Sequence, residues 1–239
     1  TILKKKCGIE KRAAWSTAIQ VDQVKAVGQR MGGTINDILL SAITGALRRY
    51  LEERGEVVHG LNIRAVVPVN LRPIEEVGQL GNRFGLVFLS LPIGISDPIK
   101  RLVVLKKRMN AIKNSPEALV ALGILNFIGL TPTQIEKIIV AIFGLKGSAV
   151  MTNVPGPRTL LYLAGAPISS IMFWVPSPSN LSLGVSMISY AGQVILGVAS
   201  DAETIPDPER MIELFQIEFE HLNRWGRPAS GAQQSPGLS

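Results

Sequence analysis

The segment from Thr152 to Pro157, with the sequence Thr-Asn-Val-Pro-Gly-Pro, restricts the backbone more than any other stretch of this chain. Each proline fixes its own φ angle, biases the residue before it towards an extended conformation, and has no N–H group to donate. Pro155-Gly156 also has the composition of a type II turn. The segment therefore predicts a stiff corner that ends an apolar strand, cannot enter a strand ladder, and holds Thr152 and Asn153 in fixed positions.

This corner has two interpretations on physical grounds alone. In the first, it is only a stiff connection between two core elements, since turn chemistry is commoner than site chemistry. In the second, the stiffness serves the polar side chains of Thr152 and Asn153, and the corner belongs to a binding or catalytic site.

The composition describes a globular protein. Its 239 residues, 46% of them hydrophobic, suffice for one large domain or two small ones with a substantial core. The single cysteine, Cys7, excludes an intrachain disulfide and a cysteine-based zinc cluster, and His59 and His221 have no motif around them, so we expect no metal site. The opening stretch, Thr1 to Lys6, is too short and too soon charged for a signal peptide, which predicts a cytoplasmic protein. The missing initiator Met also fits a processed product or a fragment.

The net charge of +7 fits nucleic acid, an anionic membrane or an anionic small molecule as a partner. The basic residues are scattered and have few aromatic residues between them, so we expect no nucleic acid and favour anionic lipid or a phosphorylated ligand. The apolar run 118–130 is interrupted by Asn126 and is shorter than the roughly 18 to 20 residues that span a bilayer. Together with residues 138–143, it makes 118–145 either core or a surface that meets lipid.

Apolar periodicity and turn residues divide the chain into helices and strands. We expect helices at 20–32, from Thr34 to near Arg54, from Asp97-Pro98 onward and from Pro206 to Trp225, and strands at 61–69, 84–91, 149–153, 181–190 and 194–199. Thr34 and Asp37 resemble a capping box, and residues 191–193 join the last two strands as a hairpin. Strands and helices mix without regular alternation, which predicts an α/β protein, a layered sandwich around a mixed sheet.

The helix that begins at Asp97-Pro98 has an apolar stripe flanked by basic residues between Lys100 and Lys113, among them Arg101 and Arg108. One interpretation is a solvated helix face, the commoner case. The other is contact with a membrane surface or with the phosphates of a cofactor.

A set of short motifs, in order along the chain, resembles the C-terminal half of the bacterial wax ester synthase/diacylglycerol acyltransferases. The motifs are Asn36-Asp37-Ile38-Leu39-Leu40, Gly45 to Leu51, Pro68-Val69-Asn70-Leu71-Arg72, Leu80-Gly81-Asn82, Thr152 to Pro157, Leu161 to Ala166, Ser189-Tyr190 with Gly192, and Asp201 with Ile205-Pro206-Asp207. This resemblance covers residues 12–225. It implies a linker from a missing N-terminal domain at 1–11 and an acyltransferase C-terminal domain at 12–225. Residues 226–239, rich in Gly, Ser, Pro and Gln, are expected to be a disordered tail.

The resemblance implies a CoA-dependent acyltransferase fold of the chloramphenicol acetyltransferase type, in which two sandwich domains face each other across a channel. The family's catalytic motif, HHxxxDG, belongs to the N-terminal domain, and this chain has no pair of adjacent histidines. The implied reaction is transfer of a long-chain acyl group from acyl-CoA, a co-substrate with no bound cofactor, to a fatty alcohol or diacylglycerol. The implied partners are the N-terminal half, on the same or a separate chain, and the lipid acceptor. A peripheral position at the inner membrane or at lipid droplets would follow, and residues 118–145 could form a tunnel wall or a membrane-facing surface.

The family motifs also indicate site residues, none of which can replace the missing general base. Asn36 and Asn153 are the predicted supports of catalysis, because a side-chain amide facing the channel can donate to a reacting carbonyl or steady the catalytic histidine. The wider substrate-binding set is Asn36, Asp37, Thr152, Asn153, Pro155, Gly156 and Pro157. For Asn36 a helix-capping role is equally open, and for Asp37 capping is the favoured role.

Two other functions compete with this one. A non-catalytic lipid-binding or interaction module could keep the fold after losing the histidine domain. A condensation-type domain acting on groups held by carrier proteins shares the fold, but the fit of Thr152 to Pro157 and of Leu161 to Ala166 favours the wax ester family.

Overall fold

A mixed sheet of seven strands forms the centre of the structure, a computed structural model that describes residues 1–70, 84–113, 147–175 and 181–225. Six strands follow the order β1-β9-β8-β5-β3-β4, and the short β2 also pairs with β9. β5 runs parallel to both β3 and β8, whereas the other pairs in the sheet are antiparallel. The strands are β1 (Lys11–Trp15), β2 (Ile19–Gln20), β3 (Ile63–Asn70), β4 (Phe84–Leu91), β5 (Ala149–Pro155), β8 (Leu183–Tyr190) and β9 (Gln193–Asp201).

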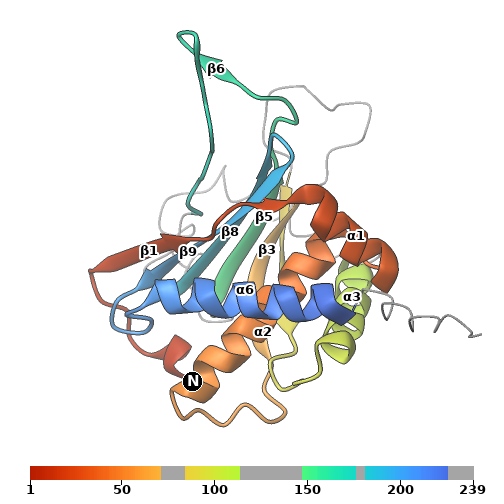
Figure 1. The fold of residues 1–239 in the computed structure, drawn as a ribbon. Coiled ribbons are helices and arrows are strands. Elements are labelled where there is room, and N and C mark those ends of the chain that lie inside the picture. The colour runs from red at the N-terminus through yellow and green to blue at the C-terminus, as the bar shows by residue number, and fades with distance from the viewer. Residues whose placement is uncertain (71–83, 114–146, 176–180, 226–239) are drawn as a thin grey trace, which may run out of the picture.

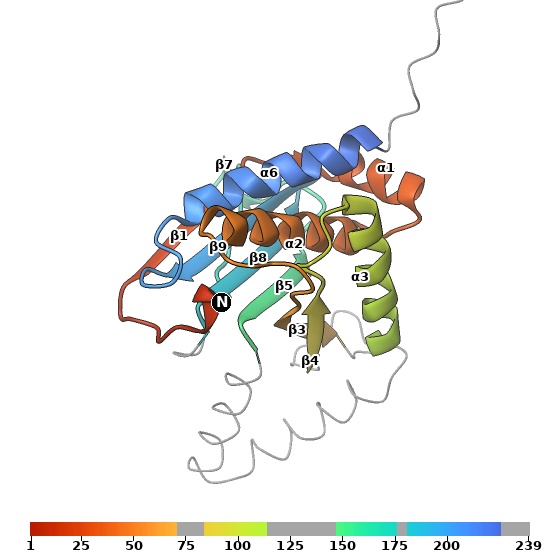
Figure 2. The same cartoon turned by 90° about the horizontal axis from the view of Figure 1, so that it is seen from below.

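Helices cover one face of this sheet, which we call the helix face (Figures 1 and 2). They are α1 (Val21–Met31), α2 (Ile35–Glu53), α3 (Pro98–Lys113) and α6 (Pro208–Trp225), and a short 3-10 helix, η1 (Ile2–Lys4), precedes them. The predicted layered α/β sandwich is confirmed, and β4 begins and ends where the sequence predicted.

The opposite side of the sheet, which we call the second face, has a separate small apolar cluster built on Val66, Val150 and Leu181. The chain segment 168–175 returns across this face. There the Val175 N–H donates to Ser186 Oγ at 3.1 Å, and the ring of Trp174 meets that of Trp15 edge to face at 6.1 Å.

Helix α2 is the central element of the helical layer, because all residues from Asp37 to Leu47 are buried. Its first turn is closed by the predicted capping box. The Asp37 N–H donates to Thr34 Oγ1 at 3.2 Å, and the Thr34 N–H donates to Asp37 Oδ2 at 2.9 Å. Such a cap stabilises a helix end by about 0.5–2 kcal/mol. Burial and cap together fix the position of the α2 N-terminus over the sheet.

One basic residue of α3 lies elsewhere than the sequence suggested. Arg101, expected on the flank of the apolar stripe, is only 1% exposed and forms a salt bridge with Glu218 of α6. Glu218 also accepts a bond from Arg49 Nε at 2.5 Å, so one carboxylate joins three helices. A buried arginine needs such a partner, because an unpaired charge is costly to desolvate. Gly45 makes room for this pair, since a Cβ atom there would overlap both charged groups.

The structure describes the N-terminal segment of the chain, but not its C-terminal end or its long apolar run. Residues 1–11, predicted to be a linker, include Leu3, which is buried in the main core, and Lys11, the first residue of β1. The predicted tail 226–239 and the apolar run 118–145 lie outside the described residues.

A β-hairpin stands away from the body of the domain (Figure 1). It consists of β6 (Tyr162–Leu163) and β7 (Ala166–Pro167), and we call residues 158–168 the arm. Ala164 and Gly165, both with positive φ angles, form its tip. At its base the Tyr190 hydroxyl accepts from the Leu161 N–H and donates to the Ile168 carbonyl, both at 2.8 Å. One side chain thus holds both strands of the arm.

Candidate functional site

Two asparagines meet where β5 passes the N-terminus of α2. Asn153 Nδ2 donates to Asn36 Oδ1 at 3.2 Å, although 117 residues separate them in sequence. Both side chains are half-buried. The structure therefore brings together the two predicted supports of catalysis. Asn36 lies on a helix and Asn153 on a strand, as the sequence predicted.

The bond between the asparagines leaves one amide group available. Asn36 uses its oxygen to accept from Asn153, so its Nδ2 group keeps two N–H donors, with no hydrogen bond to a residue that the structure describes. The group lies in the first turn of α2, where the helix dipole favours negative charge. The pair can thus present a neutral, oriented donor to a carbonyl oxygen that gains negative charge.

The capping role of this turn falls on other residues. Asp37 is 3% exposed, and its Oδ2 accepts from both the N–H and the hydroxyl of Thr34. Thr34 in turn accepts from the Asp37 N–H. The predicted cap of Asp37 is confirmed, and the bond that Asn36 makes is to β5 and not to a helix N–H.

Thr152 is separated from the asparagine pair by the strand itself. Successive side chains of a strand point to opposite faces. Met151 belongs to the core under the helices and Val150 to the cluster on the second face. Asn153 therefore lies on the helix face and Thr152, which is buried, on the second face. Their adjacency in sequence suggested one polar group, and the structure does not bring the two side chains together.

The predicted corner after Asn153 is wrong in its geometry. β5 continues to Pro155, which pairs with Ser189, and the Gly156 N–H donates to the Ser189 carbonyl at 2.8 Å. The φ angle of Gly156 is not positive, so Pro155-Gly156 is not a type II turn. The segment does enter a strand ladder.

The alternation of N–H groups along a strand explains why proline fits here. The Gly156 N–H points at β8, so the nitrogen of Pro155 points to the β3 side, where β3 pairs only with Ala149 and Val150. Proline is tolerated on a side of a strand that takes part in no ladder, and no described strand pairs with Pro155 on that side. Position 156 needs glycine because of close packing and not because of a turn, since a Cβ atom there would lie 2.4 Å from the Ser189 oxygen.

The rest of the corner continues alongside β8. The Ala191 N–H donates to the Pro157 carbonyl at 3.0 Å. Pro155 and Pro157 are exposed. They lie beside the asparagine pair in sequence, and their part in substrate binding stays a prediction.

Tyr190 positions the arm, a role that the sequence did not indicate. Its motif was noted, but nothing in Ser189-Tyr190 says that the hydroxyl bonds to two backbone groups of a hairpin that precedes it by more than twenty residues. An aromatic residue at a strand end is ordinarily read as core.

The structure has the mixed-sheet fold found in wax ester synthase and in condensation-type domains, and it corresponds to the C-terminal half of that fold. The structure matches a wax ester synthase/diacylglycerol acyltransferase from Marinobacter aquaeolei VT8 with a TM-score of 0.71 at 24% identity, over 94% of this chain and 51% of that one. It also matches the epimerization domain from the third module of tyrocidine synthetase B, with a TM-score of 0.60 at 13% identity, over 90% of this chain and 48% of that one. A family model described as the WS/DGAT C-terminal domain matches residues 80–223, and the chain belongs to this family.

Named relatives agree with that membership. The probable diacylglycerol O-acyltransferase tgs2 of Mycobacterium tuberculosis is 29% identical over 219 residues, which cover 88% of this chain and 46% of the relative. The probable diacylglycerol O-acyltransferase tgs1 of the same organism is 28% identical over 193 residues, which cover 79% of this chain and 42% of the relative. The chain therefore spans less than half the length of these curated relatives. In the part of the chain that the structure describes, no helix is long and apolar enough to cross a bilayer.

Proposed function

We propose that the chain is the C-terminal half of an O-acyltransferase that moves a long-chain acyl group from acyl-CoA to a fatty alcohol or diacylglycerol. The observation that carries the proposal is the Asn36–Asn153 pair at the N-terminus of α2. Family membership supports the acyltransferase class. The acyl-CoA donor and the lipid acceptor come from the family resemblance.

The chemistry of this pair suits the addition step of acyl transfer. Attack of a hydroxyl on a thioester carbonyl turns the carbonyl oxygen into an oxyanion. The free Nδ2 group of Asn36 can donate to that oxygen, and Asn153 holds the amide in one orientation. A single oriented donor of this kind is worth about 10²–10³ in turnover.

The general base has to come from elsewhere. His59 is exposed, and Nδ1 of His221 lies 3.3 Å from Nη2 of Arg49. Arg49 lies about 20 Å along the α2 axis from Asn36, at roughly 1.5 Å per residue. We therefore assign the base to the HHxxxDG motif of an N-terminal half, on the same or a separate chain.

The arm supports the existence of such a partner. Tyr162 is 64% exposed and Leu163 72% exposed, on a hairpin that projects from the domain (Figure 1). Exposed apolar groups that gather in one place mark interaction surfaces. In the proposed enzyme the N-terminal half covers them and closes the acyl channel over the asparagine pair.

Native mass spectrometry of the protein purified from its own source tests this proposal, with an intact mass for every polypeptide present. We expect this sequence either within a longer chain or bound to a second one, and HHxxxDG in the added part. That species should release CoA from palmitoyl-CoA in the presence of hexadecanol or diolein. A lone chain of 25.8 kDa without transfer would instead favour the non-catalytic lipid-binding module.

A further inference from the structure

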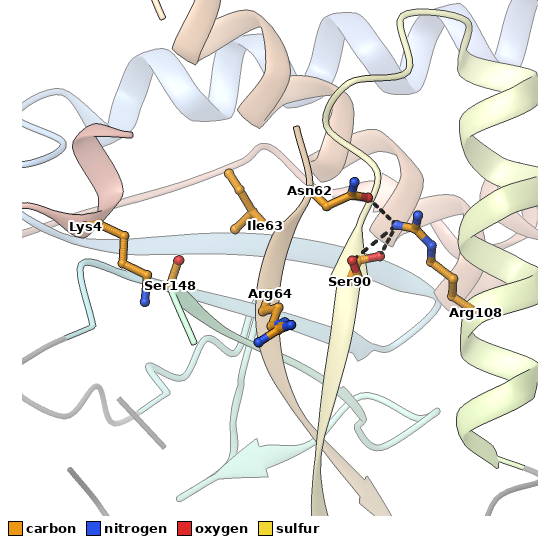
Figure 3. Close-up of a pocket in the computed structure, with 7 residues that line it drawn as sticks. All are labelled: Lys4, Asn62, Ile63, Arg64, Ser90, Arg108 and Ser148. Atoms are coloured by element: carbon orange, nitrogen blue, oxygen red, sulfur yellow. Dashed lines mark hydrogen bonds between the residues drawn. The ribbon is translucent and has the colours of Figure 1, made fainter. Parts of the chain in front are cut away.

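A polar cavity, drawn in Figure 3, lies at the end of β5 opposite to the asparagine pair. Its volume is about 560 Å³, within the range of about 300–1,000 Å³ that ligand pockets occupy. It lies where β3 and β5 begin and β4 ends, and its lining residues are Lys4, Asn62, Ile63, Arg64, Ser90, Arg108 and Ser148. Arg64 has the strand parity of Val66, which places it on the second face.

The charges that the described residues bring to this cavity are all of one sign. Lys4, Arg64 and Arg108 come from three different elements, and none of the seven lining residues is acidic. In Figure 3, Arg64 lies in the middle of the cavity. Ser148 and Lys4 lie on one side of it, and Ser90 and Arg108 lie on the other. Like charges collected in one cavity repel one another unless an anion lies among them.

Two of the cations are positioned by hydrogen bonds to described residues. Arg108 Nη1 donates to Asn62 Oδ1 and to the Ser90 carbonyl, both at 2.7 Å. Lys4 Nζ donates to the Gly147 carbonyl at 2.5 Å. The guanidinium of Arg64 has no hydrogen bond or salt bridge to any residue that the structure describes. The cavity thus has a positioned frame and a central arginine that no carboxylate of the described residues neutralises.

The electrostatics of Lys4 agree with this picture. Burial, and then the nearby charge of Arg64, lower the pKa of Lys4 below its usual value. Arg101 shows the alternative in the same molecule, since its charge is matched by the carboxylate of Glu218. Buried Arg101 thus has its own carboxylate, whereas Arg64 has none among the described residues.

We propose that this cavity binds a phosphate group, as part of a phosphate ester or a lipid headgroup. The Arg64 fork matches two phosphate oxygens, Lys4 adds a point charge, and the hydroxyls of Ser90 and Ser148 are further donors. The cavity is larger than a bare phosphate, so there is space for the group to which it is attached. The proposal does not rest on the acyltransferase function, because the asparagine pair lies about 16 Å further along β5 at roughly 3.3 Å per residue and on the other face.

Isothermal titration of the full chain with inorganic pyrophosphate tests this site. We expect saturable binding that Arg64→Ala weakens about ten-fold or more and Arg64→Lys weakens less, since hydrogen bonds from a charged donor are the stronger ones. The matched control is Lys107→Ala, which removes the same charge from an exposed position next to Arg108 and outside the cavity. Equal losses in both alanine variants would show nonspecific attraction and overturn the proposal.

Vesicle flotation separates the two sources of phosphate. Vesicles of phosphatidylcholine with phosphatidic acid are compared with vesicles of phosphatidylcholine alone. Binding that needs phosphatidic acid and is lost in Arg64→Ala assigns the site to a lipid headgroup, whereas pyrophosphate binding without flotation assigns it to a soluble phosphate ester. If pyrophosphate does not bind and flotation does not depend on Arg64, the proposal is overturned. Melting curves of the variants exclude misfolding, because Arg64 is exposed and its replacement leaves no cavity in the core.

Discussion

The two ends of β5 offer opposite kinds of polar chemistry. At the Asn153 end the polar groups are neutral amides on the helix face, held by one hydrogen bond beside a helix N-terminus. At the Ser148 end three cations gather around a cavity. A neutral oriented donor suits an oxygen that becomes negative only during a reaction, whereas fixed positive charges suit a ligand that carries negative charge permanently. One strand can therefore serve two sites that do not interfere.

The sharpest test of this contrast is Asn36→Ala in the complete enzyme. We expect turnover to fall about 100-fold, because one donor to the oxyanion is lost, while the melting temperature and pyrophosphate affinity stay close to those of the parent. Steady-state kinetics and differential scanning calorimetry check both. Parallel losses of activity and stability would return Asn36 to a purely structural role.

Asn153→Ala refines that result. Asn153 acts through Asn36, so the single variant should cost about ten-fold in turnover, and the double variant should be no slower than Asn36→Ala. A double-mutant cycle in kcat measures this coupling. Additive effects would mean that the two asparagines work independently.

Gly156→Ala disturbs the backbone of β5 at its Asn153 end. The added methyl group would lie 2.4 Å from the Ser189 carbonyl, so we expect a loss of about 1–3 kcal/mol in the free energy of unfolding, the range for overpacking. Urea denaturation followed by circular dichroism measures it. Pyrophosphate binding by the folded fraction should be unchanged, and a loss there would show that the two ends of β5 are coupled.

The smallest expected effect is that of Thr34→Ala, which removes the cap beneath Asn36. It should lower the free energy of unfolding by about 1 kcal/mol. Thr44→Ala, which removes a buried hydroxyl bonded to the Leu40 carbonyl one helical turn away, is the comparison within the same helix. If Thr34→Ala lowers turnover beyond its effect on stability, then the cap also positions the amide.

The sequence predicted the parts that local chemistry determines. The capping box at Thr34 and Asp37, the strand at 84–91 and the hairpin turn at Ala191-Gly192 all depend on residues close together in sequence, and all are present. Asn36 and Asn153 were selected as family motif positions, and the structure joins them by a hydrogen bond. Their substrate contacts stay predictions.

The features that sequence reasoning missed depend on distant neighbours. Whether proline ends a strand or sits within one depends on which side of the strand is paired, and only the short pairing of β3 with β5 decides that for Pro155. The buried position of Arg101 depends on Glu218, 117 residues away. The basic cavity draws Lys4, Arg64 and Arg108 from separate elements, so no local pattern could reveal it.

The clamp at Tyr190 has a consequence for the modularity of the protein. Because one hydroxyl bonds to both Leu161 and Ile168, the two strands of the arm leave and rejoin the domain at nearly the same point. The hairpin between them could be excised and bridged by a short glycine linker, since closing a short loop costs little extra entropy. The remaining domain would keep its sheet, its amide pair and its cavity, and would lose only the apolar surface that we assign to partner binding.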